Sequence, residues 1–179
     1  NEAPTPSSAS TARGRVVELG NFWYSMNGVG SDYMIRKYAY NGTYLGEEAT
    51  IPGSGLAWAL TASRTLPVLC ASRSSSFYFA CFGVNLTTGA LSEPILSPTY
   101  AVRPRELFFI GTYLHVIFQT SVNFITLELN ETGHILGQVG SAIDLYSSTF
   151  IANCSTPTAS IATTGLYPFG AYSVNVFEN

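Results

Sequence analysis

Asparagines and cysteines, rather than acids or histidines, are the residues whose spacing in this 179-residue chain suggests chemistry. Four asparagines begin Asn-x-Ser/Thr tripeptides, the acceptor sequence for N-linked glycans: Asn41, Asn85, Asn130 and Asn153. The first three lie 44 and 45 residues apart, each directly after a stretch with alternating apolar residues. Such positions are typical of exposed hairpin turns, so the sequence predicts N-linked glycans and secretion. The alternative is that asparagine and threonine are simply good turn residues.

The cysteines favour the same compartment. Cys70 and Cys81 lie symmetrically about the polar stretch 73–76, so on two paired strands they would face each other. Directly opposite residues have Cβ atoms about 4.5 to 5.5 Å apart, which allows a disulfide bond in an oxidising compartment. Two buried free thiols are the alternative. Cys154 is left over, which predicts either a bridge to another chain or a buried free thiol.

Familiar catalytic and metal-binding patterns are missing from the sequence. The acidic residues are scattered, adjacent Glu47 and Glu48 would point to opposite faces of a strand, and the two histidines, His115 and His134, are far apart. The sequence has no nucleophile elbow, phosphate-binding glycine loop or zinc-protease motif. We therefore predict that the chain is not an enzyme and that it binds no cofactor and no metal.

The composition narrows the class of protein further. Apolar residues make up 46% of the chain and charged residues only 11%, with a formal net charge of −3. No basic stripe is present to follow a phosphate backbone, so we expect no nucleic acid partner. No apolar run approaches the roughly 18 residues that cross a bilayer, so we expect no membrane span. Residues 1–12 are rich in Pro, Ser and Thr and predict a flexible arm, whereas 13–179 predict a single domain.

A repeat of about 45 residues organises the chain. Each unit contains short stretches with period-two apolar residues, separated by turns that contain Asn, Gly or Pro. The fourth unit has only three such stretches before the sequence ends. The predicted strands are 16–19, 21–26, 33–40 and 44–51; 56–60, 67–71, 77–84 and 90–95; several within 107–139; and 145–152, 158–163 and 171–177.

This repeat resembles that of β-propellers, whose blades are four-stranded antiparallel sheets. It lacks the Trp-Asp and Gly-His pairs of WD repeats, the paired glycines of kelch repeats and the Ser-x-Asp-x-Gly-x-Thr-Trp box of sialidases. It therefore indicates an architecture and no named subfamily. We predict an all-β, propeller-like array of about four four-stranded antiparallel blades, either complete or part of a larger propeller. A β-sandwich is the alternative.

The resemblance also implies where a partner would bind. In a propeller, successive turns lie on two opposite faces, and the three repeated Asn turns would share one of them. Arg and Tyr carry much of the binding energy at protein interfaces. The predicted binding residues on the other face are Asp32, Arg73, Tyr100, Arg103, Arg105, Tyr167 and Phe169.

We predict a secreted or cell-surface glycoprotein module that binds another protein chain or receptor. Such a module could be one piece of a multi-chain or proteolytically cut ectodomain. The alternative is a glycan-binding, lectin-like propeller, which would need the same aromatic and polar residues at matching positions of each blade. The loops predicted for the free face differ in length and residue type, which favours protein binding.

Overall fold

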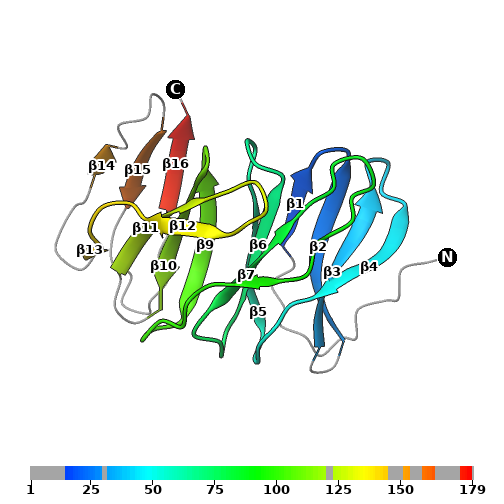
Figure 1. Cartoon of the computed structure of the whole chain (residues 1–179), viewed down its shortest axis with the longest axis horizontal. Helices are drawn as coiled ribbons and strands as arrows, with labels where there is room; N and C mark the ends of the chain where they lie inside the picture. Colours follow the sequence, from blue (N-terminus) through cyan, green and yellow to red (C-terminus); the bar gives the residue numbers. More distant parts are fainter. Residues whose placement is uncertain are drawn as a thin grey trace.

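The computed structural model describes the backbone of residues 15–29, 32–119, 123–144, 151–153, 159–163 and 174–178, and the side chains of 15–26, 33–119 and 124–142. Strands that follow one another pair antiparallel and form four sheets (Figure 1). Sheet 1 consists of β1 (Val16–Leu19), β2 (Phe22–Val29), β3 (Asp32–Ala39) and β4 (Tyr44–Thr50). Sheet 2 consists of β5 (Ala57–Ala62), β6 (Val68–Arg73), β7 (Phe79–Gly83) and β8 (Ile95–Leu96). Sheet 3 consists of β9 (Pro104–Ile110), β10 (Tyr113–Phe118), β11 (Asn123–Leu129) and β12 (Ile135–Gln138), with β13 (Ile143–Asp144) also paired to β11, and sheet 4 of β14 (Ile151–Asn153), β15 (Ala159–Thr163) and β16 (Val174–Glu178).

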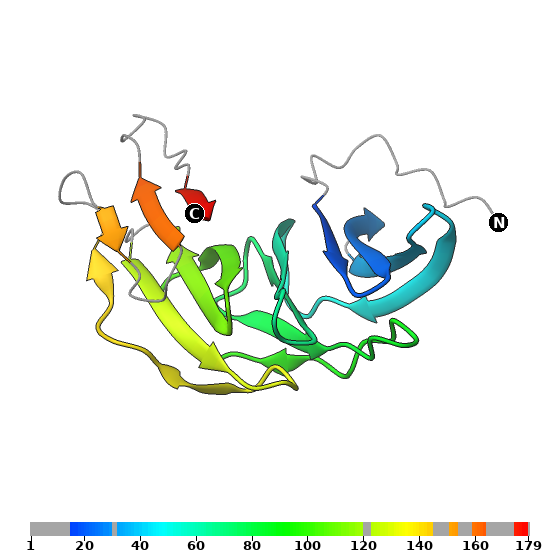
Figure 2. The same cartoon turned by 90° about the horizontal axis from the view of Figure 1, so that it is seen from above.

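The sheets stand side by side in an arc (Figure 2). The first strands of sheets 1, 2 and 3 line its concave side, and β5 contacts both β1 and β9. The outer strands lie toward the convex side (Figure 2). Sheets arranged radially in this way are the blades of a propeller, so the predicted fold is confirmed.

The outer strand of sheet 2 differs from the prediction. A strand was expected over 90–95, but the structure has a single bridge between Val84 and Leu91 followed by the two-residue strand β8. Pro94 interrupts the stretch because proline has no N–H to donate to the ladder. Ser92 compensates locally: its N–H donates to the Gly83 carbonyl at 2.8 Å, and its hydroxyl accepts from the Gly83 N–H at 2.9 Å.

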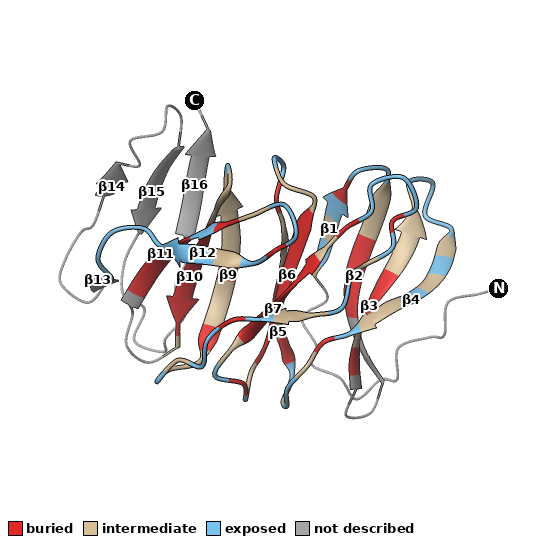
Figure 3. Cartoon of the chain, viewed as in Figure 1, coloured by how far each residue is buried: buried red, intermediate tan, exposed pale blue. Residues whose placement is uncertain are grey.

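Two apolar cores fill the spaces between consecutive sheets (Figure 3). We call the face of a sheet toward the next sheet its trailing face and the opposite one its leading face. Because side chains alternate along a strand, each central strand contributes to both. Fully burying one such side chain stabilises the fold by about 1.5 to 3 kcal/mol. The first core includes Tyr24, Met26 and Ile35 of sheet 1 with Leu69, Ala71 and Phe82 of sheet 2, and the second includes Val68 and Phe79 of sheet 2 with Leu114, Val116 and Leu127 of sheet 3.

The three repeated asparagines make the same side-chain hydrogen bond within their turns. In each case the side-chain Oδ1 accepts a hydrogen bond from the N–H of the threonine two residues later, at 3.1 Å for Asn41, 3.0 Å for Asn85 and 3.1 Å for Asn130. Each turn joins the third strand of its sheet to the outer strand. This bond replaces part of the backbone ladder at the turn, which gives asparagine a structural role at all three positions.

The turns of sheets 2 and 3 also reach over the preceding sheet. Gly89 lies against Phe22 and Lys37 of sheet 1, where an added Cβ would approach the Phe22 ring to 2.8 Å. Gly133 lies against Val68 and Cys81 of sheet 2, where a Cβ would meet the Cys81 Cβ at 3.2 Å. Both glycines have a positive φ, of 72° and 93°, which other residues adopt only with strain. The turns therefore require glycine both for their shape and for this close approach.

In sheets 1 and 2 the turn lies over the same cross-strand pair, and we call this pair, together with its register equivalent in sheet 3, the seat. By register, the seat pairs Tyr24 with Lys37 in sheet 1, Cys70 with Cys81 in sheet 2, and His115 with Thr126 in sheet 3. In sheet 1, the Tyr24 hydroxyl donates to the Gly89 carbonyl at 2.9 Å, and the Lys37 ammonium donates to the Thr88 carbonyl at 3.1 Å. These two hydrogen bonds therefore join sheet 1 to the turn of sheet 2.

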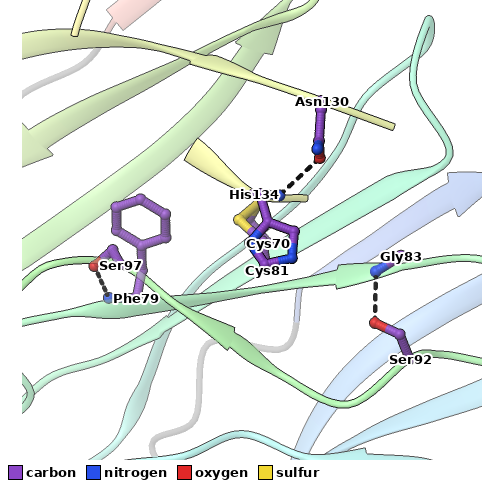
Figure 4. The surroundings of a disulfide bond; sticks show 8 residues. All are labelled: Cys70, Phe79, Cys81, Gly83, Ser92, Ser97, Asn130 and His134. Atoms are coloured by element: carbon purple, nitrogen blue, oxygen red, sulfur yellow. Dashed lines mark hydrogen bonds between the residues drawn. A yellow bond between two sulfur atoms is a disulfide. The ribbon is translucent and has the colours of Figure 1, made fainter. Parts of the chain in front are cut away.

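The seat of sheet 2 is a disulfide. Cys70 and Cys81 are directly opposed on β6 and β7, with Cα atoms 4.1 Å apart, and their sulfur atoms are bonded. Both are fully buried beneath the 130–134 turn, whose Asn130 side chain accepts from the His134 N–H at 3.0 Å (Figure 4). The predicted disulfide is confirmed.

Two glycine substitutions separate the backbone and packing roles of these turns. Gly89 and Gly42 both have positive φ, of 72° and 86°, but an added Cβ meets nothing within 4 Å at Gly42. Alanine at either position costs about 1 to 2 kcal/mol of backbone strain. We expect Gly89→Ala to lose about 1 to 3 kcal/mol more, because its Cβ overlaps Phe22. Urea unfolding measures both variants, and equal losses would contradict the packing role.

Candidate functional site

The face opposite the repeated Asn turns carries the loops and links where β1, β5 and β9 begin. Within the described residues these are the link 51–56, the loop 74–78 and the connector 97–103. Because every sheet is an up-and-down meander, connections between strands two and three and between sheets come out on the same side. This loop face lies at the bottom of Figure 1.

A cavity of about 180 Å³ lies beneath the connector on this face. It is lined by Tyr100, Ala101, Val102, Phe118, Ile125, Gln138 and Ala142. The lining comes from three separate parts of the chain: the connector, the central strands of sheet 3, and its outer edge. Six of the seven lining residues are apolar or aromatic, so the cavity suits a small apolar group.

Tyr100 anchors the connector over this cavity. Its ring stacks on Phe79 with centroids 6.2 Å apart and meets Phe118 edge-on at 5.0 Å. The backbone continues the pairing with β7, since the Tyr100 N–H donates to the Phe77 carbonyl at 2.7 Å. Burial raises the pKa of the Tyr100 phenol, and a hydrogen bond with Ser97 opposes this shift. The connector is therefore a fixed element of the surface.

An arginine lies beside the anchored ring. The guanidinium of Arg103 sits over the Phe77 ring, 5.2 Å from its centroid, and Phe77 is 39% exposed. The backbone of Arg103 also contacts the residue that follows β10, because the Arg103 carbonyl accepts a hydrogen bond from the Gln119 N–H at 3.0 Å. The loop face thus combines an apolar cavity, an exposed aromatic ring and a cation, the residue types that dominate protein-binding hot spots.

A second group of polar residues lies at the concave edge. Arg15 at the start of β1 forms an ion pair with Glu106 of β9, so the pair reaches across β5, which lies between these two strands. Arg105 lies over the Trp58 ring, 5.9 Å from its centroid. Trp58 falls where the register between β5 and β6 shifts, a bulge that re-aims one side chain. We call the residues of these two contacts, Arg15 with Glu106 and Arg105 with Trp58, the axial cluster; Arg105 and Glu106 are consecutive on β9, so the two contacts lie on opposite faces of that strand.

His115 is buried and belongs to the seat of sheet 3. Its ring stacks between Phe108 and Phe124, with centroid distances of 5.0 and 5.1 Å, and its Nδ1 lies 3.0 Å from the Thr126 hydroxyl. Burial lowers the pKa of His115 to about 4. The imidazole is therefore neutral at neutral pH and acts as a packed ring with one polar contact.

The structure separates the residues that the sequence grouped into one binding surface. Tyr100 and Arg103 lie together, whereas Arg105 belongs to the axial cluster. Arg73 is 5% exposed, and its guanidinium donates to the carbonyls of Gly55 at 3.0 Å and Ile51 at 3.2 Å. It therefore fixes the link between sheets 1 and 2. Asp32 begins β3.

Several other predicted residues cannot be placed. The side chains of Asp32 and Asn153, and all of Cys154, Tyr167 and Phe169, fall outside the described residues. Asn153 contributes only its backbone, as the last residue of β14.

Sequence reasoning missed most of the cavity and the axial cluster. Phe118 and Ile125 look like ordinary core residues of a strand, and only the fold brings them under the connector. Phe77 lies in a turn, where its exposure has no sequence signal. Trp58 is flanked by two alanines in an apolar strand, and no glycine or proline marks the bulge.

The described part of the chain offers neither a cluster of metal ligands nor a membrane-spanning helix. No three His, Cys, Asp or Glu side chains in the described ranges gather closely enough to hold a metal ion. No helix among these residues is long and apolar enough to span a membrane.

Comparison with solved structures supports the architecture. The chain is similar to two proteins provisionally named 6-phosphogluconolactonases, from Bacteroides uniformis (TM-score 0.58, 14% identity) and Bacteroides fragilis (TM-score 0.57, 15% identity). It is also similar to the Swd1 β-propeller domain of Myceliophteria thermophila (TM-score 0.51, 12% identity). Each match covers 92% of this chain, which spans only 56%, 56% and 50% of the three neighbours respectively. No protein-family model and no curated protein sequence matches the chain.

These neighbours establish the propeller fold and correct one prediction. The sequence led us to expect that the chain is not an enzyme, but two of the neighbours that share its fold carry the name of an enzyme. The error lay in treating the lack of local motifs as evidence against catalysis. In a propeller, side chains from separate inner strands can meet without any short sequence pattern, as Arg15 and Glu106 do.

Proposed function

We propose that this chain is a secreted or cell-surface glycoprotein that binds another protein through its loop face. The observation that carries the proposal is the apolar cavity beside the exposed Phe77 and the Arg103 guanidinium. Tyr100 holds the rim in place from the buried side, so little ordering is needed on binding.

The chemistry of this surface specifies the bound segment. The cavity of about 180 Å³ is smaller than the roughly 300 to 1,000 Å³ of pockets that enclose small molecules. It has room for one side chain, such as leucine or phenylalanine. The adjacent Arg103 favours a carboxylate nearby in the partner, since a guanidinium binds carboxylates with two parallel hydrogen bonds. The expected ligand is a peptide segment with an apolar residue next to Asp or Glu.

Protein binding fits the loop face better than glycan binding. A lectin-like propeller repeats its sugar site from blade to blade, but the links 51–56 and 97–103 share neither sequence nor contacts. This cavity is lined by the connector and by sheet 3, and the surface at Arg73 is occupied by bonds to the link 51–56. The aromatic and polar groups are therefore not arranged as repeated sugar platforms.

Three features support secretion with N-linked glycans. The Asn41 and Asn85 side chains are exposed at turn tips, and Asn130 is partly exposed. All three lie in turns that join the third strand of a sheet to its outer strand, on the side away from the loop face, where glycans would leave the loop face free. The Cys70–Cys81 disulfide suits an oxidising compartment. Cys154 would in that compartment form a bridge to another chain.

Secretion from animal cells tests the first part of the proposal. We expect the protein in the medium, with an intact mass that falls on glycosidase treatment and with Asn41 and Asn85 converted to aspartate. Reduction should raise the mass by the two hydrogens of the Cys70–Cys81 bond. Retention inside the cell, or a mass insensitive to glycosidase, would contradict it.

A displayed library of random dodecapeptides tests the binding surface. We expect wild-type protein to select peptides with Leu, Phe or Trp beside an acidic residue. Ala142→Trp fills the cavity from an exposed position, and Arg103→Ala removes the cation; each should weaken the selected peptides about tenfold or more. Leu86→Ala, on the opposite face, is the matched control. No selected motif, or equal binding to Ala142→Trp, would end the proposal.

The axial cluster favours a second candidate, hydrolysis of an anionic sugar lactone. Glu106 and its partner Arg15 supply a carboxylate and a cation at this edge, and two structural neighbours are named 6-phosphogluconolactonases. If this candidate holds, wild-type protein should hydrolyse 6-phosphogluconolactone faster than buffer, and Glu106→Gln should reduce the rate about a hundredfold. A wild-type rate equal to the spontaneous rate would eliminate it.

A further inference from the structure

The leading face of sheet 1 differs from the leading faces that this chain covers itself. One row of paired residues can be compared directly, because its third-strand member lies three residues before the turn asparagine in each sheet. By register, this row is Ala62, Leu69 and Phe82 in sheet 2, Phe109, Leu114 and Leu127 in sheet 3, and Glu18, Trp23 and Tyr38 in sheet 1. Sheets 2 and 3 pack apolar side chains into the cores at this row, whereas sheet 1 presents two aromatic rings and a carboxylate.

The aromatic rings of this face contact one another and remain accessible. The rings of Trp23 and Tyr40 stack at 5.9 Å, those of Tyr38 and Tyr44 meet at 5.5 Å, and Tyr40 is 65% exposed. β4, the outer strand of the sheet, has no buried residue (Figure 3). We call the surface formed by these four rings and Glu18 the aromatic face. Its rings hold one another in position, so a partner meets a surface that is already ordered.

Glu18 gives the aromatic face an unpaired negative charge. It is exposed on β1 directly opposite Trp23, which places the two Cβ atoms about 4.5 to 5.5 Å apart. No cation of the described residues forms an ion pair with its carboxylate. Glu47 of β4 differs, because its Oε1 lies 3.2 Å from Arg36 Nη2. An apolar partner would bury the Glu18 charge without compensation, so the partner must bring a cation to this position.

The trailing face of the same sheet shows such a contact in complete form. The Lys37 ammonium lies over the Phe22 ring, 5.5 Å from its centroid, and 2.7 Å from Glu48 Oε1. A ring, a cation and a carboxylate are therefore combined there. Trp23 follows Phe22 in β2, and Trp23 with Glu18 supplies the ring and the carboxylate on the leading face. In the described part of the chain, the rings that have a cation over them are Phe22, Tyr33, Phe77 and Trp58, and Trp23 is not among them.

The described cations of this chain are already engaged elsewhere. Seven of its eight Lys and Arg residues lie in the described part, and each has a partner there. They are Arg15, Arg36 and Lys37 in ion pairs, Arg73 bonded to the link 51–56, Arg103 and Arg105 over aromatic rings, and Arg64 with a contact of its own. The eighth, Arg13, falls outside the described residues. A cation for Glu18 is therefore to be sought in another molecule.

We propose that the aromatic face binds an arginine-containing segment of a partner protein, with the guanidinium over Trp23 and paired with Glu18. A guanidinium is planar, so it stacks on a ring and donates two parallel hydrogen bonds to a carboxylate. A lysine ammonium lacks this planar fork. The rings of Tyr38 and Tyr44 give an apolar residue beside the arginine a surface to pack on. The aromatic face shares no residue with the loop face, so the two surfaces bind independently.

A displayed library of random dodecapeptides tests the proposal. The bait is the full chain carrying Ala142→Trp and Arg103→Ala, which disable the loop face. We expect the selected peptides to share an arginine next to an apolar residue. Fluorescence anisotropy then measures the dissociation constant of a labelled selected peptide. Lysine in place of its arginine should weaken binding about threefold or more, and glutamine about tenfold or more.

Variants of the bait locate the contact. Glu18→Gln removes the charge of an exposed side chain, and Trp23→Leu installs the residue that sheets 2 and 3 have in this row; each should weaken binding about tenfold. Glu131→Gln, which changes an exposed acid in the Asn turn of sheet 3, is the matched control and should bind as the bait does. Glu18→Arg should bind the peptide with glutamate in place of arginine better than the bait does. Only a direct contact produces this reversal.

Four outcomes overturn the proposal. The first two are selected peptides without a shared arginine and an unchanged affinity in Glu18→Gln. The third is a two-chain mass in light scattering that Glu18→Gln abolishes, which would assign the face to a second copy. The fourth is tighter peptide binding by Arg13→Ala, which would assign the face to an arginine of this chain. In the otherwise wild-type chain, Glu18→Gln should leave binding at the loop face unchanged, so the proposed function and this inference can fail separately.

Discussion

Sheets 2 and 3 of this protein each depend on the contact between a glycine turn and a cross-strand pair of the sheet before it. The contact occurs twice in the described chain, at Gly89 over sheet 1 and at Gly133 over sheet 2, on equivalent positions. Its chemistry differs each time: hydrogen bonds from Tyr24 and Lys37 in one sheet, a disulfide in the next. In both cases the backbone of the glycine turn lies so close to the preceding sheet that it fixes the angle and spacing of the two sheets.

This fixed angle has consequences for function. With the sheets held radially, all overhanging turns lie on one face, and the loops that vary in sequence lie on the other. The turns are constrained by packing, so they are poor places for a binding site to diversify. The connector 97–103 is held differently: Tyr100 anchors it through two aromatic contacts and through the hydrogen bond from its N–H to the Phe77 carbonyl. The concave edge is also formed by this geometry, which brings Arg15 and Glu106 together across a strand.

Much of this fold could be predicted from local patterns, and most of the site could not. Period-two apolar stretches and evenly spaced asparagines predict the four sheets, because strand alternation and turn chemistry are local properties. The disulfide follows from symmetry about a turn. The burial of Arg73 could not be predicted in this way, because its hydrogen-bond partners are carbonyls of a link about 20 residues away in the sequence. The cavity, the bulge at Trp58 and the Arg15–Glu106 pair arise only when separate sheets meet.

A double-mutant cycle between Phe22 and Gly89 tests the turn contact most directly. The added Cβ of Gly89→Ala overlaps the Phe22 ring, so removing the ring should relieve the overlap. We expect Phe22→Ala with Gly89→Ala to be less destabilising than the sum of the single changes, by about 1 kcal/mol or more. The same cycle with Gly42→Ala should be additive. Additive free energies of unfolding for Phe22 and Gly89 would show that the turn does not hold the sheets together, and would contradict this account.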